Sequence, residues 1–192
     1  LGDSMAYTCA YYPTPDATLD EAQENKFRLI FEKMNLKPGD KHLDVGCGWG
    51  SMVRYAARQG VKSLGVTLSK EQAEWAQAKI IEEGLEDLAE VRFLDYRDVT
   101  ETGFDAISSI GLLEHIGVKN FASYFEFLAD KLRPGGVMVN HCITYPDNHK
   151  TPQGDFINRY IFPDGELTGS GTIIHEMQDH GFEVFHEENI RF

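Results

Sequence analysis

The amino-acid sequence predicts a protein of the α/β class: a doubly wound, mostly parallel sheet with helices on both faces. Two observations lead to this prediction. Short apolar runs of strand length alternate with amphipathic helical patterns along most of the 192 residues. A glycine-rich turn at residues 46–50 directly follows the first apolar run, and sheets of this kind bind ligands at that end of their strands. The length suits one domain with a substantial hydrophobic core.

Start signals place the elements of the first half of the chain. Thr18 and Glu21 form T-x-x-E, a capping box, and apolar side chains then repeat at helical spacing until a K-P-G-D stretch. A similar arrangement, Ser69 with Gln72 three residues later, begins another helix. Between these two helices we expect a strand at 43–46, a helix at 49–59 and a strand at 61–68.

The second half continues the alternation. Asn120 is expected to cap a helix whose apolar side chains keep helical spacing, and the R-P-G-G stretch at 133–136 ends it. Residues 145–170 lose periodicity and collect Pro, Gly, Asp and Asn, which is typical of a long surface excursion that is either functional or mobile. The remaining expected elements are strands at 91–94, 104–110, 137–144 and 182–190 and a helix at 170–180.

Composition and charge argue against several kinds of protein. A formal net charge of -13 and a pI near 4.9 argue against nucleic acid as a partner, because phosphate binding needs a dense field of Lys and Arg. The three cysteines, Cys9, Cys47 and Cys142, lack metal-ligand spacing. We therefore expect no metal site, a reduced intracellular chain, and a packing role for Cys47. The sequence shows no signal peptide and no membrane-spanning stretch, and it begins with Leu1, which suggests a piece of a longer protein.

The glycine-rich turn indicates which ligand the sheet binds. The loop reads G-x-G-x-G, with Gly46, Gly48 and Gly50, whereas the dinucleotide fingerprint is G-x-G-x-x-G. Ser51 stands where that fingerprint has its third glycine, and the loop lacks the Lys-Ser/Thr ending of a phosphate loop. With Asp44 before it, the D-V-G-C-G-x-G stretch resembles the first motif of class I S-adenosylmethionine-dependent methyltransferases. A turn whose glycines serve packing only is the alternative.

Further stretches make a closer resemblance. In chain order they read YTCAYY (7–12), GVTLSKEQ (65–72), SIGLLEHIG (109–117), NHCIT (140–144) and RYIFPDGEL (159–167). Their joint order and spacing resemble the cyclopropane fatty acid synthase and cyclopropane mycolic acid synthase family over nearly the whole chain. The resemblance implies a Rossmann-like methyltransferase sheet, with S-adenosylmethionine as cofactor and S-adenosylhomocysteine as product.

The resemblance also implies how the cofactor is held. Tyr7 and Thr8 are expected to close over it, and Gly46 and Gly48 to contact its methionyl part. Tyr96 falls where the family packs an aromatic ring near the adenine. The full set of expected cofactor residues is Tyr7, Thr8, Asp44, Gly46, Gly48, Gly50, Thr67, Leu68, Gln72, Tyr96 and Ile110.

The ribose side departs from the usual adenosine site. Such sites commonly carry an acid at the end of the second strand, and this chain has Thr67 and Leu68 there instead. The T-L-S stretch followed by Gln72 is the family's own pattern at this place, and it is implied to hold the ribose and adenine. A plain capping box remains the other interpretation of Ser69 and Gln72.

The family's active site is built around a bound bicarbonate ion. Groups that match Cys9, Glu114, His141 and Ile143 hold this ion in the family, Cys9 and Ile143 through their backbone amides. In those enzymes a cis double bond of an acyl chain attacks the sulfonium methyl group, and proton loss from the resulting carbocation closes a cyclopropane ring. A carboxylate and a histidine facing one small anion suit its use as a general base. Aromatic candidates for the wall of an acyl tunnel, or for the core, are Tyr11, Tyr12, Phe156, Tyr160 and Phe162.

We therefore expect an S-adenosylmethionine-dependent C-methyltransferase that adds a methylene across a cis double bond of an unsaturated phospholipid acyl chain. Formation of a methyl branch from the same cation is the nearest alternative. A small-molecule methyltransferase and a non-catalytic cofactor-binding fragment are the others, and the first of these leaves Cys9, Glu114 and His141 without a role. A cytoplasmic protein is expected, with peripheral contact at the inner membrane surface through apolar residues of 145–170.

Residues 1–192 are expected to form a single methyltransferase domain. Its parts are an N-terminal lid and helix at 1–40, a cofactor-binding core at 41–144, a substrate-side excursion at 145–170 and a truncated C-terminal helix and strand at 171–192. The family completes its anion site with a tyrosine shortly after a stretch similar to the terminal E-E-N-I-R-F. That tyrosine, the final helices and the last sheet strand are expected to be missing from this sequence.

Overall fold

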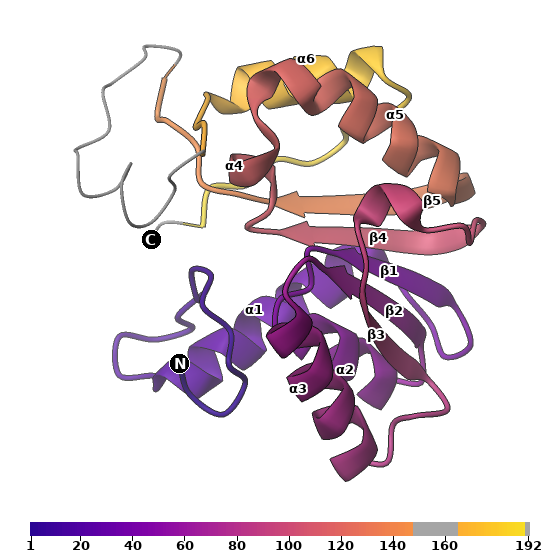
Figure 1. Cartoon of the computed structure of the whole chain (residues 1–192). Coiled ribbons are helices and arrows are strands. Elements are labelled where there is room, and N and C mark those ends of the chain that lie inside the picture. Colours follow the sequence, from indigo (N-terminus) through magenta and orange to yellow (C-terminus); the bar gives the residue numbers. More distant parts are fainter. Residues whose placement is uncertain (148–164, 191–192) are drawn as a thin grey trace.

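The computed structural model describes residues 1–147 and 165–190 and confirms the predicted class (Figure 1). Its five strands form one parallel sheet in the order β3-β2-β1-β4-β5. The strands are β1 (Lys41–Val45), β2 (Lys62–Thr67), β3 (Ala89–Phe93), β4 (Phe104–Ile110) and β5 (Leu132–His141). The strand order reverses between β1 and β4, so a ligand crevice is expected at the carboxyl ends of these two strands.

Helices cover both faces of the sheet, as predicted. Figure 1 shows α1, α2 and α3 on one side of the sheet and α5 and α6 on the other. The helices are α1 (Leu19–Met34), α2 (Ser51–Arg58), α3 (Lys70–Glu82), the single turn α4 (Leu113–Ile116), α5 (Phe121–Lys131) and α6 (Ser170–Asp179). None of the helices in the described part of the chain is long and apolar enough to span a bilayer.

The helix starts follow the local signals. The Thr18 hydroxyl accepts from the amide of Glu21 at 3.3 Å, and the Glu21 carboxylate accepts from the amide of Thr18 at 2.7 Å. The two bonds form the predicted capping box of α1. Ser69 caps α3 by accepting from the amide of Gln72 at 3.2 Å. Both signals are local, so the sequence predicts them without knowledge of the fold. The side-chain cap expected from Asn120 is wrong: its side-chain amide donates to the carbonyl of Ile116 at 2.7 Å and makes no capping bond to α5.

Apolar packing fixes the helices on the sheet. On one face Phe27 and Ile30 of α1 pack with Met52 of α2. On the other face Tyr124 and Phe125 of α5 pack against side chains of β1, β2 and β4. All of these side chains are buried, and full burial of each large apolar side chain stabilises a fold by roughly 1.5–3 kcal/mol.

The strand expected at 182–190 is wrong. In the structure this segment follows α6 without joining the sheet. The ring of Phe182 packs on Phe125 of α5, with 6.1 Å between ring centroids, and the carboxylate of Glu188 lies 2.8 Å from the Lys33 ammonium of α1. Side-chain contacts therefore fix the two ends of the segment, and its backbone pairs with no strand in the described residues. An apolar pattern favours a strand, but only backbone pairing makes one.

The boundaries of β5 also differ from the expectation. α5 ends at Lys131, as the R-P-G-G stretch predicted, but Leu132 already pairs with Phe104 of β4. The pairing register then shifts by three residues, because Phe104 pairs with Leu132 and Ala106 with Val137. Pro134 lies in this irregular stretch, and a bulge suits it because proline has no N–H to donate to a ladder. The strand ends at His141.

The two described ends of the 145–170 excursion lie together. The amide of Tyr145 donates to the carbonyl of Thr168 at 3.0 Å, and Tyr145 forms an isolated parallel bridge with Gly169. The amide of Glu166 donates to the carbonyl of Glu114 at 2.9 Å. The base of the excursion therefore lies beside α4. The tunnel candidates Phe156, Tyr160 and Phe162 lie outside the described residues.

Candidate functional site

A pocket lies at the carboxyl ends of β1 and β4, where the reversal of strand order predicts one. The glycine loop forms its floor, and the N-terminal segment lies over it. It is lined by Met5, Ala6, Tyr7, Thr8, Phe27, Asp44, Gly46, Cys47, Gly48, Trp49, Ser51, Met52 and Ile110. The predicted cofactor residues that the fold brings together there are Tyr7, Thr8, Asp44, Gly46, Gly48 and Ile110.

The three loop glycines serve different purposes. All have positive φ, +72° at Gly46, +54° at Gly48 and +70° at Gly50, a conformation that side chains disfavour. A Cβ on Gly46 would lie 2.9 Å from the side chain of Leu112, and one on Gly48 would lie 3.3 Å from the Tyr7 ring. A Cβ on Gly50 would instead meet an α3 alanine at 2.9 Å. Packing therefore explains Gly50 and also acts at Gly46, while Gly46 and Gly48 both line the pocket.

Helix α1 holds the N-terminal segment over the loop. The Gln23 side-chain amide donates to the carbonyl of Thr8 at 3.0 Å, and the Lys26 ammonium donates to the Thr8 hydroxyl at 2.6 Å. Lys26 is fully buried, and burial lowers its pKa to about 8. Sequence reasoning missed this lysine. Its signal is a charged residue at an inward helical position, four residues after Ala22 and four before Ile30.

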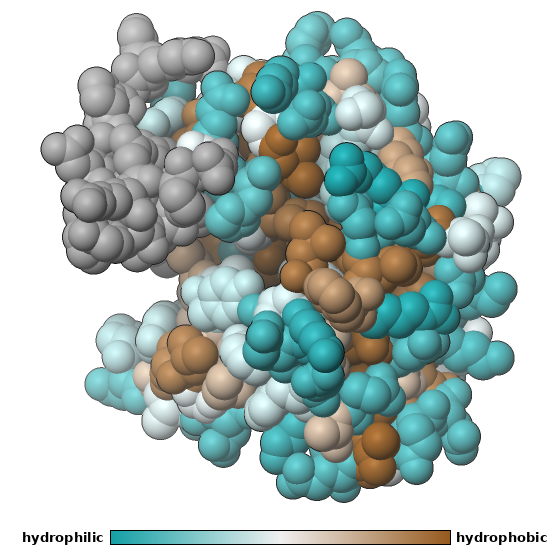
Figure 2. All heavy atoms as spheres, in the orientation of Figure 1, coloured by the Kyte–Doolittle hydropathy of each residue, from teal (hydrophilic) through white to brown (hydrophobic). Residues whose placement is uncertain are grey.

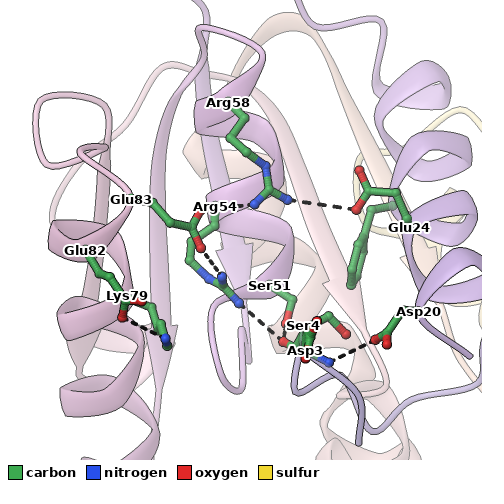
Figure 3. Close-up of a pocket in the computed structure, with 11 residues that line it drawn as sticks. Asp3, Ser4, Asp20, Glu24, Ser51, Arg54, Arg58, Lys79, Glu82 and Glu83 are labelled. Carbon is green, nitrogen blue, oxygen red and sulfur yellow. Dashed lines mark hydrogen bonds and ion pairs between the residues drawn. The ribbon is translucent and has the colours of Figure 1, made fainter.

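A larger hollow lies between α1, α2 and α3 and contains none of the predicted site residues (Figure 3). Its wall is charged, with Arg54 paired to Glu83 and Arg58 3.0 Å from the same carboxylate. The carbonyl of Ser4 accepts from the Ser51 hydroxyl at 2.6 Å and from the Arg54 guanidinium at 3.3 Å. These hydrogen bonds hold the N-terminal segment in place just before Met5 to Thr8, the residues that line the smaller pocket.

Thr67, Leu68 and Gln72 lie beside the pocket, at the end of β2 and the start of α3. The Thr67 hydroxyl donates to the Gln72 side-chain oxygen at 2.8 Å, and the Gln72 amide donates to the Tyr7 hydroxyl at 3.4 Å. The side chain of Leu68 is 71% exposed. Ser69 alone caps the helix. The Gln72 side chain is thus directed to the N-terminal segment rather than to a capping box.

The expected adenine-side aromatic, Tyr96, packs on α5. Its ring stands edge-on to Tyr124 and Phe127, with centroid separations of 5.4 and 5.6 Å. Tyr96 lies just after β3, in a single turn of 3-10 helix. Its contacts in this structure are those of a core residue at the rim of the sheet.

Asp44 is the buried acid of the pocket. Its carboxylate accepts from the Ser108 hydroxyl at 2.5 Å. Burial raises the pKa of Asp44 to about 7, and the positive charge of Lys26 acts against that rise. Burial also raises the pKa of Cys47 well above its ordinary value. A thiol with that shift remains protonated, which agrees with a packing role for Cys47.

Two further predicted residues meet beyond the end of β5. The Glu114 carboxylate accepts from the amide of Ile143 at 2.8 Å through Oε1. Its second oxygen, Oε2, is buried and has no hydrogen-bond partner within the described residues. This amide was expected to bind a bicarbonate ion, and here Glu114 occupies it. Glu114 Oε2 is therefore the atom of this pair that can still accept a hydrogen bond.

His141 and Cys9 complete the predicted set. His141 ends β5, and its Nδ1 is buried without a hydrogen-bond partner in the described part of the chain. Burial, together with the nearby charge of Lys26, lowers the pKa of His141 to about 4, so the imidazole is neutral near pH 7. Cys9 is exposed and lies close enough to Lys26 to interact with its charge. The charge of Lys26 therefore acts on residues from both parts of the predicted site, Cys9 and His141.

Comparison with known proteins yields a consistent set of similarities. The model of the mycolic acid cyclopropane synthetase family matches residues 1–192. The chain is 65% identical over 192 residues to a probable fatty acid methyltransferase of Mycobacterium tuberculosis. The alignment covers 100% of this chain and 45% of that protein. It is also 40% identical over 183 residues to the cyclopropane-fatty-acyl-phospholipid synthase of Escherichia coli K12. This alignment covers 94% of this chain and 46% of that protein.

Solved structures agree with these relatives. The cyclopropane synthase MmaA2 from Mycobacterium tuberculosis superposes with a TM-score of 0.87 at 32% identity, over 95% of this chain and 68% of that one. The mycolic acid cyclopropane synthase CmaA1, in a complex with S-adenosylhomocysteine and CTAB, gives a TM-score of 0.83 at 32% identity over 96% and 69%. The chain spans about half the length of the curated relatives it matches.

Proposed function

The chain belongs to the mycolic acid cyclopropane synthetase family, and we propose that it binds S-adenosylmethionine and methylates a double-bonded carbon of an unsaturated fatty acyl chain. The observation that carries the proposal is the juxtaposition of two site halves. A glycine-floored pocket holds the buried acid Asp44. The charge of Lys26 acts on Asp44 and also on His141, and His141 and Glu114 each carry a buried polar atom that lacks a partner in the described residues.

The residues of the pocket fit S-adenosylmethionine. Gly46 and Gly48 line the pocket and have no side chain, so a ligand can approach the backbone closely there. Asp44 offers a carboxylate to an ammonium group. Thr67 and Gln72 offer a hydroxyl and an amide beside the pocket, which suit ribose hydroxyls. The cofactor supplies an electrophilic methyl group on a sulfonium centre.

The remaining task of the protein is to align an alkene and to remove a proton. An alkene is a poor nucleophile, so the acyl chain must be held in line with the methyl group, away from water that would quench a cation. Glu114 is buried on α4 and His141 is half-buried at the end of β5, and each has a buried polar atom that lacks a partner in the described residues. They suit the binding of a small anion such as bicarbonate, or direct proton transfer.

The surface agrees with an apolar substrate. Figure 2 shows apolar side chains gathered in the middle of this face, between the part that carries α5 and the part that carries α3. Leu68 and Phe93, at the ends of β2 and β3, are 71% and 57% exposed. Large apolar side chains exposed at a ligand-binding edge are typical of contact with an apolar partner.

Two products are open to this chemistry, and one experiment separates them. The protein is incubated with S-adenosylmethionine and vesicles of a monounsaturated phospholipid, and the lipid is analysed by proton NMR. Cyclopropyl signals support addition of a methylene across the double bond. A branched methyl or exomethylene signal supports methyl-branch formation, which the 65% identical relative favours because it is named a probable fatty acid methyltransferase. Unchanged lipid argues for a cofactor-binding module without activity on such chains.

Cofactor affinity is expected to fall as the pH drops below about 7. Asp44, whose pKa burial raises to about 7, must be ionised to attract an ammonium group, and protonation removes that attraction. Isothermal titration with S-adenosylhomocysteine between about pH 6 and pH 8 tests this. Asp44→Asn is expected to bind about tenfold more weakly, with a flat pH profile. A flat profile in the unmodified protein would contradict the role of Asp44.

Peripheral membrane contact is expected to depend on apolar burial rather than on charge. The chain carries a net charge of -13, so anionic lipid repels it on average. We expect co-sedimentation with uncharged phosphatidylcholine vesicles that persists in high salt, with an apolar contact near the strand ends. Binding that needs anionic lipid and disappears with salt would indicate a basic patch instead.

A further inference from the structure

A chain of buried polar side chains crosses the sheet and ends at Asp44. The His42 ring on β1 contacts two hydroxyls: Nδ1 lies 2.8 Å from Ser63 Oγ of β2, and Nε2 lies 2.9 Å from Ser108 Oγ of β4. The Ser108 hydroxyl in turn donates to Asp44 at 2.5 Å. All four side chains are buried, His42 and Ser108 completely. The chain therefore runs across three neighbouring strands to the acid of the pocket.

The donor and acceptor properties of these side chains determine which atom carries the proton in each of the three hydrogen bonds. Ser108 has a single hydroxyl proton, which it donates to the Asp44 carboxylate, so it must accept from the Nε2–H of His42. A neutral ring that carries its proton on Nε2 has an acceptor at Nδ1, and Ser63 donates to it. Burial lowers the pKa of His42 to about 3, which agrees with the neutral form. Every donor in the chain points toward Asp44.

Packing alone does not explain a histidine at this position. On the same face of the sheet, the β4 residue that pairs with His42 is Ala106, which is apolar and completely buried. Burying an imidazole and two hydroxyls in such surroundings is unfavourable unless they are hydrogen-bonded, and an apolar side chain would fill the space without that cost. What His42 adds is a directed hydrogen bond to Ser108, and through it a fixed orientation of Asp44.

We propose that His42 is a positioning residue for the cofactor site, which acts through Ser108 to hold the Asp44 carboxylate ionised and directed at the cofactor's ammonium group. The inference rests on the proposed binding of S-adenosylmethionine. The other titratable groups near Asp44 are Lys26 of α1, Cys47 of the loop and Tyr124 of α5. Of these only Lys26 carries charge near pH 7. It favours the ionised carboxylate, but it is bonded to Thr8 and does not fix the carboxylate's direction.

The test compares two replacements of His42 in the chain. His42→Leu removes both hydrogen bonds, whereas His42→Gln keeps one donor and one acceptor on a side chain of similar length. S-adenosylhomocysteine binding is measured by isothermal titration across the pH range. We expect His42→Leu to bind about tenfold more weakly near neutral pH and to lose affinity at a higher pH than the unmodified protein. His42→Gln is expected to recover most of both properties.

A control separates positioning from general stability. Leu64 follows Ser63 on β2, so its side chain lies on the opposite face of the sheet from the four groups, in the apolar cluster with Leu43 and Val45, and Leu64→Ala opens that cluster. It is expected to lower the unfolding temperature while leaving the pH profile of binding unchanged. If His42→Leu binds with the affinity and pH profile of the unmodified protein, the inference is wrong. If the unmodified protein fails to bind S-adenosylhomocysteine, the proposed function itself fails.

A second measurement needs no folded variant. Nitrogen-15 NMR of the histidine side chains in the unmodified protein reports which ring nitrogen carries the proton. We expect His42 to be neutral with its proton on Nε2, and to stay so from about pH 5.5 to pH 8. A charged ring in that range, or a proton on Nδ1, would reverse the direction of the chain and overturn the inference.

Discussion

Replacing Glu114 by glutamine is expected to lower the rate of lipid methylation by at least about a hundredfold, while cofactor affinity stays within about twofold. The amide keeps the shape of the side chain, and its oxygen can still accept from the amide of Ile143. What is lost is the charge and the accepting capacity of Oε2, the buried atom that lacks a partner in the described residues. The rate is measured with a monounsaturated phospholipid, and the affinity by titration with S-adenosylhomocysteine.

Glu166 provides a matched control for this substitution. Its backbone amide donates to the carbonyl of Glu114, but its carboxylate accepts from the amide of Val118 at 3.0 Å. Glu166→Gln makes the same chemical change next to the site and is expected to keep most of the activity. Equal rates in Glu114→Gln and the unmodified protein would remove Glu114 from the proposed chemistry. Equal losses in both variants would point to local structure instead.

The sequence predicts most of the fold because its signals are local. The apolar runs that became β1 to β5 and the capping box at Thr18 depend on neighbouring residues only. The failure at 182–190 has the opposite cause. A strand depends on a partner, and in the described residues the segment is fixed by Phe182 on α5 and Glu188 on α1. No local pattern contains that information.

The site divides in the same way. The glycine loop and Asp44 form a contiguous motif, so the sequence predicts their part of the pocket. Lys26 and His42 are missed because each is a polar residue inside an apolar pattern, and only the folded neighbours, Thr8 and Ser108, explain it. Conversely, local reasoning leaves the role of Gln72 open between a capping box and a cofactor contact. The structure shows its side chain bonded to Thr67, beside the pocket.

The second large effect is expected in the glycine loop. Replacement of Gly50 is expected to lower stability, whereas replacement of Gly48 is expected to weaken cofactor binding. A Cβ at Gly50 would meet Ala76 of α3 at 2.9 Å and Val91 of β3 at 3.2 Å, both in the core. Strain at positive φ and overpacking together are expected to lower the free energy of unfolding by about 2–4 kcal/mol in Gly50→Ala. The atoms nearest to a Cβ at Gly48 would all belong to the Tyr7 side chain, the first at 3.3 Å. Urea unfolding and cofactor titration of the two variants provide the comparison.

Gly84→Ala isolates the part of the loss that comes from backbone strain. Gly84 has φ +66°, close to the +70° of Gly50, and a Cβ there would meet nothing within 4 Å. The difference between the Gly50 and Gly84 variants therefore measures the clash with α3 and β3. Gly48→Ala should resemble Gly84→Ala in stability, yet bind cofactor more weakly, because its methyl group displaces the Tyr7 ring that lies over the loop. If Gly48→Ala lost stability as Gly50→Ala does, the glycines would serve packing alone, and the loop would not identify a ligand.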